Sequence, residues 1–317
     1  SPALIDKAGY RHFMEKEIFE QPDAISHTIS SMTDLDGGLK GNFSEKELLD
    51  IKRIVLLAAG TSFYAGLVGK YWIEKLSGIH VSVEIASEFR YRSPTTEGFS
   101  TAIAISQSGE SLDTLMALRY ASNHSLKTIA IVNVLESTIA REVDMVLPTR
   151  AGPEIGVAST KSFTSQLVVL LSLAISLAVS RKKLSKKEAA EIKEKLLSLP
   201  RTVGETMELF DSTKEIANKI STSKSCLFLG RGVLYPIALE AALKLKELSY
   251  IHAEGFAAGE MKHGPIALIE KGMPVICFLD DDDLSVKTSS NLREAEARGA
   301  SIIVVSTKAS KKLAEER

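Results

Sequence analysis

Three serines and a glycine stand where an apolar run ends and a helical pattern begins, in the hexapeptide 106–111, Ser-Gln-Ser-Gly-Glu-Ser. The run 101–105 predicts a buried strand, and residues 112–122 predict a helix. The first N–H groups of a helix have no partner within it, and the helix dipole favours an anion there. No lysine or arginine lies in the loop, so neutral donors would hold a phosphate. The alternative interpretation is a well-capped helix after a strand.

A second set of polar residues lies on a predicted helix over 236–250. Glu240, Lys244 and Glu247 are spaced so that all three share one helix face. A carboxylate beside an ammonium could move a proton between two atoms of a substrate. The same spacing is typical of a surface ion pair between Glu240 and Lys244, and the pattern by itself favours that interpretation.

Three further loops carry polar residues whose pattern is weaker evidence for a functional site. His263 lies in a loop bounded by glycines, where an imidazole could act as acid or base, although a loop histidine is more often simply solvated. In the segment 154–161, Ser159 or Thr160 would cap the helix that follows, and either could also hold an anion or sugar hydroxyls. The loop 60–62, Gly-Thr-Ser, has the same two interpretations.

The elements that must position these residues alternate along the chain. Apolar runs alternate with helical patterns from residue 54, and the pattern restarts at residue 225. Uninterrupted apolar strands predict the α/β class, with parallel sheets covered by helices on both faces. A glycine loop follows the first strand of each half, at Gly60 and Gly230, which indicates a duplicated domain.

The expected organisation follows from this repeat. The second half stops soon after its run 302–305, so we expect it to lack a counterpart of the last strand and helix of the first half, and we expect the chain to be a fragment of a longer protein. The expected parts are an N-terminal helical segment over 1–50, a first α/β domain over 51–181, a helical linker over 182–224 and an incomplete second domain over 225–317.

The composition is that of a globular protein, with 44% hydrophobic and 25% charged residues among 317. A net charge of −1 gives no electrostatic basis for binding nucleic acid or an acidic membrane. Cys226 and Cys277 lie in apolar strand runs, so we expect small core residues and neither a disulfide nor a metal site. We expect no stretch long enough to span a bilayer, with 167–179 as a buried helix, and a cytoplasmic location.

Taken together, five segments resemble the isomerase part of the glutamine–fructose-6-phosphate aminotransferases, in that family's order and spacing. The segments are 9–22, 106–111, 154–161, 243–250 and 252–265. The resemblance covers essentially the whole chain and implies two tandem sugar-isomerase (SIS) domains, each a doubly wound, mainly parallel sheet flanked by helices. It implies that fructose 6-phosphate and ammonia become glucosamine 6-phosphate, without a metal or organic cofactor, in a homodimer. The ammonia would come from an N-terminal glutaminase domain that this chain lacks.

The resemblance also implies roles for single residues. Glu247 matches the base that moves a proton between C1 and C2, Lys244 is its helical neighbour at the site, and His263 matches the ring-opening histidine that the family supplies from the neighbouring subunit. The loop 106–111 would hold the phosphate, helped by Thr61. The implied substrate-binding set is Thr61, Ser62, Ser106, Gln107, Ser108, Ser111, Val157 and Ser159.

The family also ends in a mobile tail that bears a catalytic lysine, and this chain ends before it, at Arg317. We therefore expect the chain as written to bind sugar phosphate better than it turns it over.

Two other functions stay open. One is another enzyme with tandem SIS domains, such as a phosphosugar deaminase or a fructosamine-type deglycase, which would not be expected to carry segments 11–22 and 252–265 in this form. The other is a non-catalytic sugar-phosphate sensor, which would need the serine loop but not Glu247 and His263 together.

Overall fold

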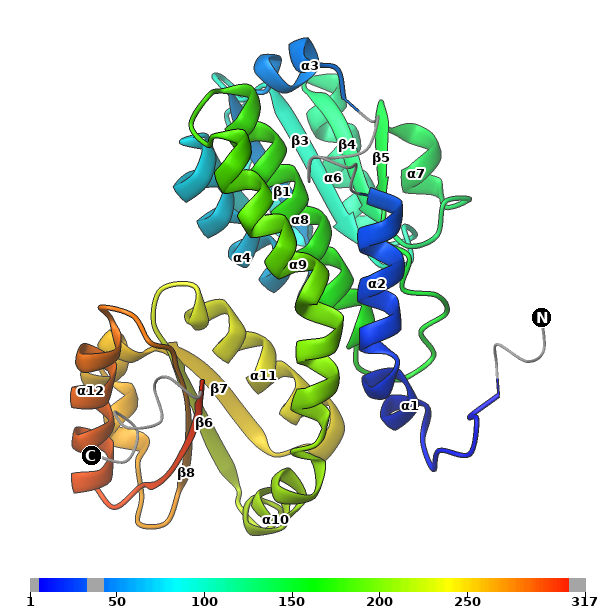
Figure 1. Cartoon of the computed structure of the whole chain (residues 1–317). Helices are drawn as coiled ribbons and strands as arrows, with labels where there is room; N and C mark the ends of the chain where they lie inside the picture. Colours follow the sequence, from blue (N-terminus) through cyan, green and yellow to red (C-terminus); the bar gives the residue numbers. More distant parts are fainter. Residues whose placement is uncertain (1–5, 33–42, 308–317) are drawn as a thin grey trace. The chain divides into compact units, whose positions relative to one another are not determined.

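The computed structural model describes residues 6–32 and 43–307, which form two compact units, residues 1–208 and 209–317. Each unit has its own parallel sheet with helices against it (Figure 1). This confirms the predicted α/β class with two parallel sheets. The boundary between the units follows Glu208, within the stretch expected to be a helical linker.

The sheet of the first unit has five parallel strands among the described residues, in the order β2-β1-β3-β4-β5. The chain therefore runs outward from β1 to β2 and then returns to the other side of β1. At such a reversal the connections after two neighbouring strands leave toward opposite faces, and ligands bind outside the carboxyl ends there. The strands are β1 (Arg53–Ala58), β2 (His80–Ile85), β3 (Thr101–Ser106), β4 (Lys127–Val132) and β5 (Met145–Pro148).

Helices cover this sheet and extend along its flank. Most follow a strand, whereas α1, α2 and α3 precede the sheet and α9 follows α8. The helices are α1 (Phe13–Phe19), α2 (Gln21–Met32), α3 (Glu45–Asp50), α4 (Gly60–Ser77), α5 (Ala86–Phe89), α6 (Leu112–Asn123), α7 (Thr138–Glu142), α8 (Lys161–Ser180) and α9 (Lys186–Met207).

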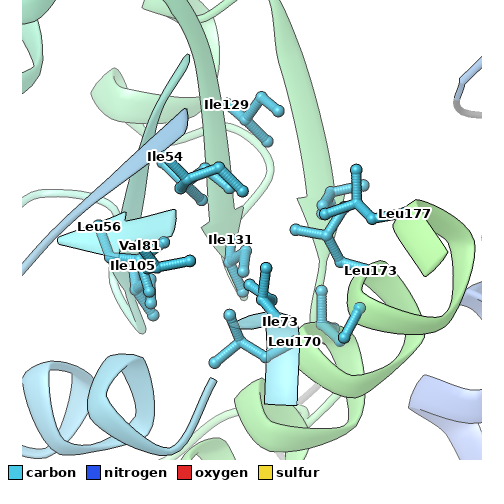
Figure 2. Close-up of a cluster of buried hydrophobic side chains, with 14 of the residues drawn as sticks. Ile54, Leu56, Ile73, Val81, Ile105, Ile129, Ile131, Leu170, Leu173 and Leu177 are labelled. Carbon is cyan, nitrogen blue, oxygen red and sulfur yellow. The ribbon is translucent and has the colours of Figure 1, made fainter. Parts of the chain in front are cut away.

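The main core of the first unit lies between the sheet and two helices, α4 and α8. Figure 2 shows isoleucine and leucine side chains of the strands meeting Ile73 of α4 and Leu170, Leu173 and Leu177 of α8. Gly69 of α4 permits the close contact between α4 and α8, because a Cβ atom at this position would lie 2.9 Å from Leu170 Cδ2. Helix α8 is thus held against α4 by shape as well as by apolar burial.

Helix α8 corrects one expectation about length. It has 20 residues and is the one helix in the described part of the chain that is long and apolar enough to cross a membrane. Most of its residues are buried within the first unit, and a helix that is apolar all round is typical of a core position. The interpretation of 167–179 as a buried helix was right, although the helix is longer than that.

The second unit repeats the first with fewer strands. Its sheet has the order β7-β6-β8-β9, which matches the order β2-β1-β3-β4, and no strand corresponding to β5 occurs in the described residues up to 307. The strands are β6 (Ser225–Gly230), β7 (His252–Ala257), β8 (Pro274–Leu279) and β9 (Ser301–Ser306); the helices are α10 (Phe210–Ile220), α11 (Leu234–Ser249), α12 (Ser285–Ala297) and the 3₁₀ turns η2 (Ala258–Lys262) and η3 (Pro265–Leu268).

Strand β7 was not predicted from the sequence. Its sequence, His-Ala-Glu-Gly-Phe-Ala, lacks the apolar run that marks the other strands. Gly255 is needed there because a Cβ atom would lie 2.8 Å from Leu239 Cα of α11. Strand β7 therefore combines pairing with β6 and close approach to α11 with only a few apolar side chains, among them Ala253 and Phe256.

The packing of α8 gives a first prediction. Leu170→Ala removes a fully buried side chain between α4 and α8 and should lower the free energy of unfolding by about 2–5 kcal/mol. Leu197→Ala on α9 is the matched control, since Leu197 is 53% exposed and its loss should change stability by about 0.5 kcal/mol or less. Urea denaturation of both variants measures the difference. Equal losses would show that α8 is not held by this contact.

Candidate active site

The serine loop lies at the carboxyl end of β3, where α6 begins. Ser111 occupies the N-cap position of α6, and its side chain makes no capping hydrogen bond. Two of the loop's hydroxyls instead shape the loop, since Ser106 Oγ accepts from Gly109 N at 3.0 Å and Ser108 Oγ accepts from Glu110 N at 3.2 Å. The first turn of α6 therefore presents N–H groups that no N-cap side chain covers, as an anion site requires.

Gly109 is the residue that this loop cannot replace. Its φ is +66°, and a Cβ atom would lie 2.0 Å from Ser137 Oγ. Its neighbour Glu110 accepts a hydrogen bond from Thr138 N at 2.8 Å, and this backbone donor lowers the pKa of the Glu110 carboxyl. The start of α7 thus packs against the loop and fixes its conformation.

The loop after β1 lies next to the serine loop, because β1 and β3 are neighbours in the sheet. We predicted a loop over 60–62, but α4 already begins at Gly60, so Thr61 and Ser62 belong to its first turn. Ser62 Oγ accepts from Gln166 Nε2 of α8 at 3.0 Å. The topology thus brings Thr61, Ser62 and the loop 106–111 to one edge of the sheet, at the point where the strand order reverses.

A third loop, 154–160, precedes α8. Val157 is 84% exposed, and Ser159 Oγ donates to Glu154 Oε2 at 3.0 Å. Thr160 occupies the N-cap position of α8, as one of the two predicted alternatives, but its side chain makes no capping hydrogen bond. Glu154 Oε1 instead accepts from Thr160 N at 2.8 Å and from Ser162 N at 3.2 Å. The loop folds back on itself, which lets a carboxylate several residues away reach the start of the helix.

In the second unit, α11 carries the three charged residues on one face. Lys244 Nζ lies 2.8 Å from Glu247 Oε2 and 3.3 Å from Glu240 Oε1. Glu240 is buried, whereas the side chain of Glu247 keeps 33% of its exposure. The Glu240–Lys244 ion pair expected from the pattern is present, but it is not a surface pair. The arrangement leaves a carboxylate accessible beside a partly buried ammonium.

His263 follows the turn η2 in the same unit. Its backbone N–H donates to Glu260 O at 2.9 Å, and the residue is exposed. An exposed imidazole on a short turn is accessible for proton exchange with a ligand.

The sequence and the fold of this chain are both similar to those of known proteins. The sequence model of the SIS domain matches residues 47–176 and 219–317. The C-terminal domain of glucosamine-fructose-6-phosphate aminotransferase from Francisella tularensis superposes with a TM-score of 0.94 at 44% identity, covering 97% of this chain and 87% of that one. The chain belongs to the SIS domain family.

Relatives known from sequence agree with the structural comparison. The glutamine–fructose-6-phosphate aminotransferases of Bartonella quintana and Bradyrhizobium diazoefficiens are each 49% identical to this chain over 96% of its length. The tandem SIS chain spans about half the length of these relatives. A glucosamine-6-phosphate deaminase from Thermotoga maritima, with a TM-score of 0.74 and 24% identity over 93% of this chain and 85% of that one, shares the fold.

Sequence reasoning missed three carboxylates that shape the loops of the first SIS domain, namely Glu17, Glu110 and Glu154. Each accepts hydrogen bonds from backbone N–H groups of a loop or of a helix start. Glu17 had a usable signal, since it stands four residues after Phe13 and three after Met14 in a helix rich in apolar residues. The other two lie in polar loops, where an acidic residue carries no such signal.

The serine loop gives the second prediction. Gly109→Ala should weaken binding of fructose 6-phosphate at least about tenfold, because the φ and the contact with Ser137 would both force the loop to move. Gly204→Ala on α9 is the matched control, because a Cβ atom there meets open space. Calorimetric titration of both folded variants makes the comparison. Unchanged affinity in Gly109→Ala would contradict a phosphate site in this loop.

Proposed function

We propose that this chain is the sugar-isomerase part of a glutamine–fructose-6-phosphate aminotransferase, an enzyme that converts fructose 6-phosphate with ammonia to glucosamine 6-phosphate. The observation that carries the proposal is the set Glu240, Lys244 and Glu247 on α11. A phosphate loop alone would serve a sensor equally well. A partly exposed carboxylate beside an ammonium is what a proton transfer between C1 and C2 requires.

The first SIS domain supplies the groups that bind substrate. The N–H groups at the start of α6 and the hydroxyls of Ser106, Ser108 and Ser111 hold the phosphate, together with Gln107 and Thr61. Each hydrogen bond to a phosphate oxygen is assisted by the ligand's charge, so neutral donors suffice. Ser62, Val157 and Ser159 contact the sugar.

The acid–base groups that the proposal assigns are His263, Glu247 and Lys244. His263 opens the sugar ring by relaying the proton of the anomeric hydroxyl to the ring oxygen as the bond between C2 and that oxygen breaks, which leaves a ketone at C2. Ammonia adds to C2 and water leaves, which gives an imine. Glu247 then takes a proton from C1, the electron pair of that C–H bond forms a C1–C2 double bond, and the electrons of the C=N bond move to nitrogen, where the Lys244 ammonium stabilises the charge. Glu247 returns the proton to C2, and the proton of the C1 hydroxyl passes to the nitrogen, which leaves the amino aldose.

This chemistry needs no metal or organic cofactor from the protein. Within the described residues, no group of three or more histidine, cysteine or acidic side chains lies close enough together to hold a metal ion. The donors assigned above are all side chains and N–H groups of the chain itself.

The proposal includes the surroundings in which the chain works. We propose that the chain forms a homodimer and is located in the cytoplasm. We also propose that its parent chain carries a glutaminase domain. The length of the relatives supports the additional domain. Cys226 and Cys277 are buried and form no disulfide, and burial raises the pKa of the Cys226 thiol to about 12, which disfavours the thiolate that a nucleophile needs.

The test of the function uses the full-length product of the gene. Supplied with fructose 6-phosphate and either glutamine or ammonia, it should form glucosamine 6-phosphate, and Glu247→Gln should lower kcat by about 100-fold or more with little change in sugar-phosphate affinity. Product is measured by NMR. A deaminase or deglycase would instead release ammonia or amine from an amino sugar, and a sensor would bind without turnover.

Glu294→Gln is the control for the loss of one ion-paired carboxylate. Glu294 lies 2.7 Å from Lys262 with 32% side-chain exposure, close to the 2.8 Å and 33% of Glu247 with Lys244. It should leave kcat within about twofold of the wild type, because surface ion pairs contribute little and Glu294 has no role in the reaction. An equal loss of activity in both variants would argue against Glu247 as the base.

The dimer gives a separate prediction. If His263 serves the neighbouring copy, each mixed dimer of a Glu247→Gln chain and a His263→Ala chain contains one intact site. Random mixing of equal amounts should then restore about a quarter of the wild-type activity. Activity is measured after co-expression and purification of the two tagged chains. Absence of rescue in verified mixed dimers would place His263 in the site of its own chain.

A further inference from the structure

A carboxylate from the N-terminal helix α1 is buried against the third loop. Glu17 is 2% exposed. Its Oε1 accepts from Ile155 N at 2.5 Å and from Gly156 N at 3.0 Å, and its Oε2 accepts from Gly156 N at 3.0 Å. Burial of a carboxylate is costly unless hydrogen bonds compensate it. Glu17 and Ile155 are 138 residues apart in sequence, so this hydrogen bond is a tertiary contact that joins α1 to the loop 154–160.

Glycine at position 156 is required by the same contact. A Cβ atom on Gly156 would lie 2.5 Å from Glu17 Oε2 and 3.4 Å from Met14 Cα. A larger residue at position 156 would therefore have to displace the Glu17 carboxylate from the loop backbone. Either partner can be altered to break the contact, which makes it testable from both sides.

The loop is held at its other end by a second carboxylate. Glu154 accepts the N–H groups of Thr160 and Ser162 and the hydroxyl of Ser159. Val157 and Ser159 thus lie on a short stretch between two anchored ends. Next to it, Lys161 is buried and its ammonium lies 2.6 Å from Glu20, which follows α1 directly. The N-terminal segment therefore contacts the loop at Gly156 and again at the start of α8.

We propose that Glu17 is a positioning residue for the sugar subsite. It fixes the backbone of Ile155 and Gly156 and so directs Val157 and Ser159 toward the sugar, while the loop 106–111 binds the phosphate independently. This inference rests on the proposed function for the identity of the ligand. It makes the helix α1, which lies outside the SIS sheet, a working part of the substrate site.

The test compares the affinities of the variants for fructose 6-phosphate and for inorganic phosphate. In Glu17→Gln the amide –NH2 cannot accept an N–H, so the anchor weakens while the side-chain shape is kept. The Kd and KM for fructose 6-phosphate should rise about tenfold, with kcat within about threefold and the affinity for inorganic phosphate unchanged. Gly156→Ala should show the same pattern. The double variant should be no worse than about the stronger single variant, because both changes break one contact.

Ile25→Val on α2 is the control for a general loss of stability. Ile25 is buried among Ile29, Val168 and Leu196, away from the loop, and its loss should lower the melting temperature without changing either affinity. An unchanged affinity for fructose 6-phosphate in both Glu17→Gln and Gly156→Ala would overturn the inference. So would an equal loss of affinity for both ligands, which would indicate a general structural role.

The two proposals fail in different ways. If the wild-type protein forms no glucosamine 6-phosphate, the proposed function fails, but the ratio of the two binding constants still tests Glu17. If the wild type is active and the ratio is unchanged in both variants, only the role of Glu17 is wrong. If Glu17→Gln does not fold, Gly156→Ala alone decides the question by the same measurements.

Discussion

The burial of α8 between the sheet and its neighbouring helices is the interaction on which the first unit depends. Leu170, Leu173 and Leu177 join α8 to the core, and the close contact at Gly69 sets its distance from α4. Because α8 is fixed in this way, the groups at its N-terminal end are fixed as well. Gln166 reaches Ser62 in the first turn of α4, and Glu154 closes the loop that leads into the helix. The contacts of the first turn of α4 and of the loop 154–160 thus follow from one buried helix.

Carboxylates that accept backbone N–H groups are the recurring means of shaping these loops. Glu110 joins the serine loop to α7, Glu154 covers the start of α8, and Glu17 holds the backbone at Gly156. A carboxylate can accept several N–H groups at once, so one side chain removes much of the freedom of a loop. The start of α6 lacks such a side-chain cap, so its first N–H groups donate to no N-cap side chain.

The second unit has the strand order of the first, and in it the packing of α11 on the sheet sets the exposure of the charged residues. Gly230 and Gly255 let α11 approach β6 and β7 closely, since a Cβ atom at either position would overlap the helix backbone. This close packing buries Glu240 while Glu247, two turns further along, stays accessible. A buried carboxylate holds the ammonium of Lys244 from one side and leaves it directed at Glu247. The packing of the helix, and not the charge pattern alone, distinguishes this set from a surface ion pair.

Local patterns in the sequence were enough to predict the two parallel sheets, the serine loop after β3 and the shared face of Glu240, Lys244 and Glu247. Each of these depends on residues close together in the chain, whose period of apolarity or spacing on a helix is visible directly. Strand β7, the capping of α8 by Glu154 and the burial of Glu17 against Gly156 were decided by the tertiary structure. Their causes are close approach and hydrogen bonding between groups that the folded chain brings together, and Glu17 and Gly156 are separated by 139 residues. No local period records such contacts, because the free energy that selects them arises only when both partners are buried together.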